Sequence, residues 1–210
     1  MRWVIAAAVA FVLAAGIGLL FEAPNADPLP PGGVSVLYIG IVLVWGFVGV
    51  GAFAWLRRPD NATGGLMILV GVLVGLTAFQ FFDNEALFAI GVLVDTLCIS
   101  ALIHLLVAFP SGRLEGRWAR RTVVAAYLAG AMQLPALLVS TCPRCPMENP
   151  WLVYESEALA TVFGLVQAVF GFFALITAVV VLLHRWRTSN RLQRRGLEPV
   201  LLLGAILPVL

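Results

Sequence analysis

Two closely spaced cysteines are the residues best suited to chemistry in this 210-residue sequence. Cys142 and Cys145 stand in the segment Cys-Pro-Arg-Cys-Pro, a spacing that allows a local disulfide or a redox-active pair. In an oxidising compartment the pair favours a disulfide that fixes its loop, whereas Arg144 between the cysteines would stabilise a reactive thiolate. A half-site for a metal is the third interpretation, but two cysteines alone do not complete a tetrahedral zinc site. We therefore predict no metal site and leave the disulfide and the redox pair open.

Two ionisable residues lie within a long apolar stretch, residues 87–109. Placing Asp95 or His104 in hydrocarbon costs on the order of 3 kcal/mol each, so both should face protein or water. On a helix they would point in opposite directions and lie about 13 Å apart along the axis, so they do not form a direct pair. Asp95 is a candidate ligand or coupling residue, or else a buried hydrogen-bonded contact, and His104 could reach the membrane interface. Expected hydrogen-bond partners are three glutamines in other apolar stretches, Gln80, Gln133 and Gln167.

The motifs that mark common enzyme sites are missing from this sequence. It contains no glycine-rich phosphate loop, no Gly-x-Ser-x-Gly turn, no His-Glu-x-x-His pair and no clustered carboxylates. We therefore predict no catalytic residues and no cofactor.

The composition indicates what positions these side chains, because 61% of the residues are apolar and only 11% are charged. A water-soluble fold cannot bury that much apolar surface. The sequence predicts an all-α polytopic transmembrane bundle of about seven spans, with residues 1–210 as a single integral membrane domain. The predicted spans are residues 4–21, 34–56, 66–82, 87–109, 123–140, 159–183 and 197–210. The last would cover only about 21 Å of a hydrocarbon core of about 30 Å, so we expect a longer protein of which this chain is the front part.

The arginines predict the orientation of the bundle. With the N terminus inside, twelve of the thirteen basic residues, all arginine, fall in the inner segments, and only Arg144 falls outside. This predicts a multi-pass protein of the cell inner (plasma) membrane with a cytoplasmic N terminus. The net charge of +2 predicts no nucleic-acid partner, and the expected partner is the lipid bilayer. The predicted membrane-interface anchors are Arg57, Arg58, Arg113, Arg117, Arg120, Arg121, Arg185 and Arg187.

Small residues predict where helices pack closely, because lipid supplies no hydrophobic force between them. Gly71-x-x-x-Gly75 is the clearest candidate, and Gly46, Gly49 and Gly51 are further ones. The sequon Asn61-Ala62-Thr63 falls on the predicted cytoplasmic side, so we do not interpret it as a glycosylation site.

Four local motifs occur in a fixed order along the chain. They are Arg57-Arg58-Pro59-Asp60-Asn61, Ala108-Phe109-Pro110-Ser111-Gly112-Arg113-Leu114, the Cys142-Pro-x-Cys145-Pro loop, and Arg194-Arg195 before Glu198-Pro199-Val200. In order, spacing and topology the combination resembles the N-terminal membrane region of bacterial sensor histidine kinases. The second motif also has a structural interpretation, in which proline and glycine end a helix and Arg113 contacts membrane phosphates.

The resemblance implies a signal-sensing input region of a two-component system. A homodimer, a downstream kinase module and a response regulator would be its partners. The chain departs from the family at Gly64-Gly65, where an aromatic residue is common, and it contains no kinase module. If the resemblance holds, an eighth span should follow Leu210 and return the chain to the cytoplasm.

The leading hypothesis is therefore a non-enzymatic input region whose parent protein is a histidine kinase. One alternative is a membrane thiol-disulfide oxidoreductase that uses Cys142 and Cys145 with a quinone, although a second cysteine pair is missing. Another is a small transporter or structural membrane subunit in which Asp95 lies on the pathway, although no broken-helix repeat is visible.

Overall fold

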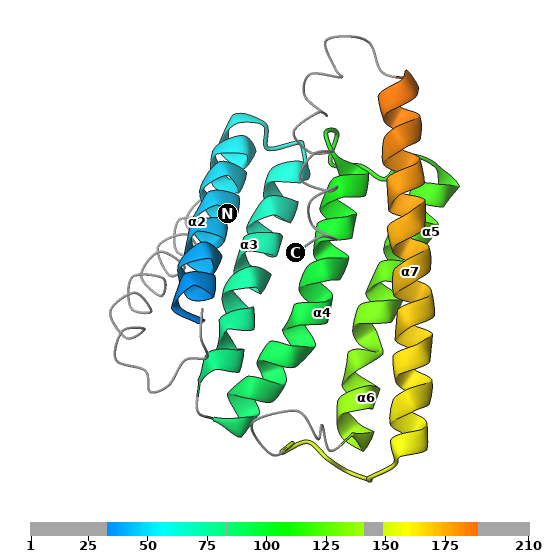
Figure 1. Cartoon of the computed structure of the whole chain (residues 1–210). Helices are drawn as coiled ribbons and strands as arrows, with labels where there is room; N and C mark the ends of the chain where they lie inside the picture. Colours follow the sequence, from blue (N-terminus) through cyan, green and yellow to red (C-terminus); the bar gives the residue numbers. More distant parts are fainter. Residues whose placement is uncertain (1–32, 83, 141–148, 189–210) are drawn as a thin grey trace.

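A computed structural model describes residues 33–82, 84–140 and 149–188 of the chain, and these residues form helices and connections without strands. Neighbouring helices run in alternating directions, and α2, α3, α4, α5 and α7 each pack against the next (Figure 1). The all-helical fold class is confirmed. The helices are α2 (Gly33–Arg57), α3 (Thr63–Thr77), the 3₁₀ turn η2 (Ala78–Phe81), α4 (Glu85–Ala108), α5 (Gly116–Ala131), α6 (Gln133–Val139) and α7 (Glu157–Thr188).

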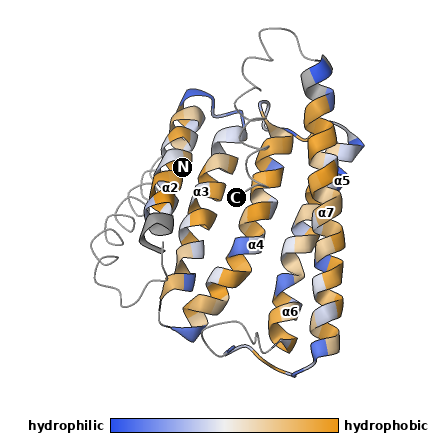
Figure 2. Ribbon diagram, viewed as in Figure 1, coloured by the Kyte–Doolittle hydropathy of each residue, from blue (hydrophilic) through white to orange (hydrophobic). Residues whose placement is uncertain are grey.

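Five helical segments are long and apolar enough to cross a membrane. Their outer faces expose large apolar side chains such as Val42, Leu165 and Phe172, at 68%, 62% and 67% exposure, which water would not tolerate over such an area. Figure 2 shows the apolar colour along the helices and the hydrophilic colour mainly at their ends and turns. Five of the seven predicted spans are thereby found, and the predictions for 4–21 and 197–210 lie outside the described residues. The five segments are Tyr38–Arg57, Thr63–Phe81, Glu85–Ala108, Gly116–Val139 and Glu157–His184.

One predicted boundary was wrong, at an arginine-rich helix end, because the span predicted to begin at residue 123 begins at Gly116. The span predicted to end at residue 183 ends at His184, and its helix α7 continues through further arginines to Thr188. The arginines lower the local hydropathy and so hide these turns from a search for apolar runs. In α5 they lie on the exposed side of an amphipathic turn, while Ala119 and Thr122 on its other side are buried. Arg117, Arg120 and Arg121 are therefore helical residues of α5, not loop residues.

Glycines bring α2 and α3 into backbone contact. A Cβ atom on Gly71 would lie 2.6 Å from a methyl carbon of Val48, and one on Gly64 would lie 2.7 Å from the carbonyl oxygen of Gly51. The predicted packing role of Gly71, Gly75 and Gly51 is confirmed, since a Cβ atom on Gly75 would also touch Val44. Gly46 and Gly49 make no such contact among the described residues, where a Cβ atom at either position would meet nothing within 4 Å.

Small side chains also bring α4, α5 and α7 together. Ala126 on α5 and Ala174 and Ala178 on α7 belong to one buried cluster, together with Ile103 and Val107 of α4. The span Gly116–Val139, fourth of the five, is formed by α5 and α6 in succession, with a break at Met132 three residues before Pro135. Proline cannot donate a backbone hydrogen bond, which explains an interruption of the helix at this place.

Candidate functional site

The first two of the four sequence motifs meet at one end of the bundle. The α2–α3 connection and the α4–α5 connection lie at the same end, because α2 and α4 run in the same direction (Figure 1). We call residues 57–61 and 109–115 the two-loop junction. It joins the α2–α3 pair to the α4–α5 pair away from the apolar middle of the helices. Such a contact can transmit a displacement of one helix pair to the other.

Asn61 connects the two loops of the junction. Its Nδ2 atom donates a hydrogen bond of 2.9 Å to the carbonyl oxygen of Pro110. Its Oδ1 atom accepts a hydrogen bond of 2.9 Å from the backbone N–H of Thr63, at the start of α3. The Thr63 hydroxyl donates to the same Pro110 oxygen at 3.2 Å. The amide of Asn61, which ends the first of the four motifs and begins the discounted sequon, therefore links the two loops.

Gly112 allows the loops to approach each other. It has φ +70°, a conformation that side-chain-bearing residues rarely adopt. A Cβ atom at this position would also collide with Oδ1 of Asn61 and lie 2.6 Å from the backbone nitrogens of Ala62 and Thr63. The predicted helix end at Phe109-Pro110 is confirmed, since α4 ends at Ala108. Gly112 is therefore required twice, once for its backbone conformation and once for the contact with the other loop.

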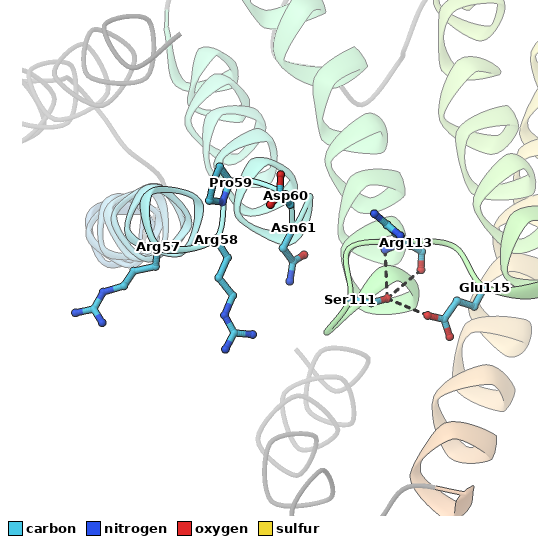
Figure 3. Close-up of a pocket in the computed structure, with 8 residues that line it drawn as sticks. All are labelled: Arg57, Arg58, Pro59, Asp60, Asn61, Ser111, Arg113 and Glu115. Atoms are coloured by element: carbon cyan, nitrogen blue, oxygen red, sulfur yellow. Dashed lines mark hydrogen bonds between the residues drawn. The ribbon is translucent and has the colours of Figure 1, made fainter.

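An open hollow of about 510 Å³ lies at the junction (Figure 3). Arg57 stacks on Phe53, with its guanidinium carbon 4.9 Å from the ring centre. The Ser111 hydroxyl donates to the Glu115 carboxylate at 3.4 Å. The hollow therefore combines guanidinium, carboxylate, amide and hydroxyl groups. Its lining residues are Arg57, Arg58, Pro59, Asp60, Asn61, Ser111, Arg113 and Glu115.

The two predicted intramembrane residues occupy different surroundings on α4. The Asp95 side chain is exposed on the outside of the described helices, close to the middle of its span. His104 is half-buried against α5, where its Nδ1 atom lies 3.3 Å from the Tyr127 hydroxyl and the two rings pack edge to face. The structure agrees with the expectation that they do not form a direct pair.

The glutamines bind elsewhere than expected. Gln167 Nε2 on α7 donates to Gln133 Oε1 on α6 at 3.2 Å, and Gln80 Nε2 donates to the carbonyl oxygen of Gly91 at 3.3 Å. Their prediction as partners of Asp95 and His104 was therefore wrong, although the expected hydrogen bonding between spans does occur. A further contact between spans that was not predicted joins the Ser100 hydroxyl to the carbonyl oxygen of Ala126 at 2.7 Å.

Most predicted anchor arginines lie at the junction end of the bundle. Arg117, Arg120 and Arg121 are exposed on the first turns of α5, and Arg187 is exposed near the end of α7. Arg121 stacks on Trp118, with its guanidinium carbon 5.4 Å from the ring centre. We call this end the arginine end. The side chain of Arg185 lies outside the described residues.

Asn149 organises the opposite end of the bundle. Its Nδ2 atom donates to the carbonyl oxygens of Leu137, at 2.5 Å, and Ser140, at 2.8 Å, beside the last turn of α6. Its Oδ1 atom accepts from the backbone N–H of Trp151 at 3.0 Å. These bonds satisfy carbonyl groups that a helix end leaves unpaired. The predicted cysteine pair, Cys142 and Cys145, falls between these contacts but lies outside the described residues.

No protein-family model, curated protein or solved structure matches the chain.

Proposed function

We propose that the chain is the membrane-embedded input region of a two-component sensor histidine kinase, with the arginine end facing the cytoplasm. The two-loop junction is the observation that carries this proposal. Two of the motifs on which the family resemblance rests are in direct contact there, through Asn61 and Gly112. A stimulus that favours one arrangement of the helices would be delivered to a kinase module at this face.

The first test is the reading frame beyond Leu210. It should encode one more span and then a kinase module with a phosphoacceptor histidine. A frame that continues into an unrelated domain, or stops, contradicts the proposal.

The second test uses the complete protein in lipid nanodiscs and measures its autophosphorylation by ATP. The substitution Gly112→Ala inserts a methyl group into the other loop, so we expect the basal rate to change by about 5-fold or more. Gly116→Ala is the matched control, because Gly116 also has a positive φ, +86°, but an added Cβ atom would meet none of the described residues within 4 Å. Equal rates for the two variants, with both folded, would exclude signalling through the junction.

The other two functions stay predictions with their own tests. For a thiol-disulfide oxidoreductase, replacing Cys142 and Cys145 with serine should abolish dithiol oxidation by a quinone. For a transporter, Asp95→Asn should change the flux into vesicles. None of the contacts among the described residues favours either function over the input region.

A further inference from the structure

The hollow at the two-loop junction contains charges of both signs. Three guanidinium groups and two carboxylates line it, from residues 57, 58 and 113 and residues 60 and 115 (Figure 3). In the described part of the chain, their side-chain interactions are the stacking of Arg57 on Phe53 and the hydrogen bond from Ser111 to Glu115. The described residues form no ion pair across the hollow, so both kinds of charge remain accessible to a ligand.

The position of the hollow along the helices limits the choice of ligand. It lies where α2 ends at Arg57 and α4 ends at Ala108, beyond the apolar segments that would occupy the hydrocarbon core. Helix ends of this kind lie at the level of the lipid headgroups. Headgroups are therefore present there at high local concentration, and the volume of the hollow is within the roughly 300–1,000 Å³ typical of small-molecule sites.

The lining groups fit a zwitterion better than a simple anion. Guanidinium groups bind phosphate oxygens through directed N–H donors. The nearby carboxylates would repel a purely anionic headgroup but would attract an ammonium group. A primary ammonium can also donate N–H bonds to carboxylate oxygens, whereas the quaternary ammonium of a choline headgroup cannot.

We propose that the hollow binds a phosphoethanolamine group, with its phosphate held by guanidinium groups and its ammonium held by a carboxylate among those that line the two walls. The group belongs to a membrane phospholipid or to a soluble phosphoethanolamine ester, and both share this chemistry. The Asn61 bonds hold the two walls in register, so that groups from different loops can act on one ligand. This inference is independent of any kinase module.

The test is lipid binding to the purified, delipidated chain in detergent, measured by native mass spectrometry. Three phospholipids with identical acyl chains are compared, with ethanolamine, choline and glycerol headgroups. We expect the ethanolamine lipid to bind about 10-fold more tightly than the other two. Tighter binding of the glycerol lipid by the unmodified protein would overturn the proposal in favour of a simple anion site.

Two double variants separate the roles of the charges. Arg58→Gln with Arg113→Gln should weaken binding of the ethanolamine lipid about 10-fold. Asp60→Asn with Glu115→Gln should weaken it as well and should strengthen binding of the glycerol lipid. An unfolded protein could not bind the glycerol lipid more tightly, so a reversal of the headgroup preference is the decisive result. Unchanged preference in both double variants would overturn the proposal.

The matched control is Arg117→Gln with Arg120→Gln, which removes two exposed arginines from the first turns of α5 outside the hollow. This variant should retain the preference for the ethanolamine lipid. If it weakened binding as much as Arg58→Gln with Arg113→Gln does, the lipid would be attracted to the arginine end in general, and the proposed site would be overturned. Soluble phosphoethanolamine is added as a competitor to identify the source. Displacement of the lipid at millimolar concentration indicates a soluble ligand, and lack of displacement indicates a lipid headgroup. Either result supports the site only when the two double variants show the expected loss.

Discussion

Asn61 illustrates how one side chain can hold two separate loops together. An amide has both donors and an acceptor, and Asn61 uses them in opposite directions, toward Pro110 in one loop and toward Thr63 at the start of α3. Thr63 is buried, at 7% exposure, so its polar groups would be costly to leave without partners. The contact therefore contributes to stability as well as to the position of the junction.

Replacing Asn61 should measure that contribution. We expect Asn61→Ala to lower the free energy of unfolding by about 1–3 kcal/mol, because it leaves the Thr63 N–H unpaired and removes the donor to Pro110. Asn61→Asp keeps the acceptor and loses the donor, so its loss should be smaller. Thermal unfolding in detergent, followed by circular dichroism, measures both variants. An Asn61→Ala protein as stable as the parent would contradict the role assigned to this amide.

Asp95 presents the opposite case, an ionisable side chain on the outside of the described helices. Ten residues into α4, it lies about 15 Å from the start of the helix and so near the centre of the span. An exposed carboxylate at that depth is costly unless it is protonated or covered. Ile99, one turn further along the same face, is also exposed, at 55%.

The cost of Asp95 can be measured directly. If this face meets lipid, Asp95→Asn should raise the free energy of unfolding by up to about 3 kcal/mol. The measured effect would be a higher melting temperature of the protein in nanodiscs. Ile99→Leu is the control on the same face and should have little effect. A lower melting temperature for Asp95→Asn would instead show that the carboxylate has a stabilising partner beyond the described residues.

At the scale of elements, glycines decide which helices touch. Gly64, Gly71 and Gly75 all lie on α3, and each faces α2 so closely that an added Cβ atom would meet it. Such close approach increases the van der Waals contact between backbones, which is the main attraction available to helices in lipid. Sequence spacing identified Gly71 and Gly75, but it did not distinguish Gly51 from Gly46 and Gly49 on the partner helix.

Alanine substitutions should separate these two classes of glycine. Gly64→Ala places a methyl group 2.7 Å from backbone atoms of Gly51 and Trp55, which cannot move aside as a side-chain tip can. We expect it to destabilise the protein by about 1–3 kcal/mol. In Gly49→Ala the added methyl group contacts no atom in the described part of the chain, so this variant should be neutral or slightly stabilising, since alanine favours helix. Melting curves of the two variants in the same detergent test this, and equal stabilities would rule out the close packing of α2 and α3.

At the scale of the whole molecule, the described helices alternate in direction and gather the arginines at one end. Among the described residues the other end carries Glu85, Glu155 and Glu157. Two carboxylates, Asp60 and Glu115, depart from this pattern, and both line the hollow. The charge asymmetry read from the sequence is therefore also an asymmetry between the two ends of the bundle.

The orientation of the bundle is testable with reporter fusions. We expect green fluorescent protein to be fluorescent when fused after Arg58 or Arg113, because the arginine end should remain in the cytoplasm. Alkaline phosphatase should be active when fused after Asn84 or Tyr154, in the connections at the other end. The reverse pattern would overturn the predicted topology and the cytoplasmic position of the junction.

Composition and spacing were enough to predict an all-helical chain with spans of these approximate limits. Each segment must separately be apolar and long enough to cross the membrane, and it must keep its arginines outside the hydrocarbon core. Such requirements can be read along the sequence. The contacts of Asn61 with Pro110, of Gly64 with Gly51 and of Gln133 with Gln167 were not readable in this way. Each joins different helices or loops, and which side chains meet depends on the rotation and mutual packing of helices. Only the tertiary structure decides that, and it placed two separate motifs at one junction.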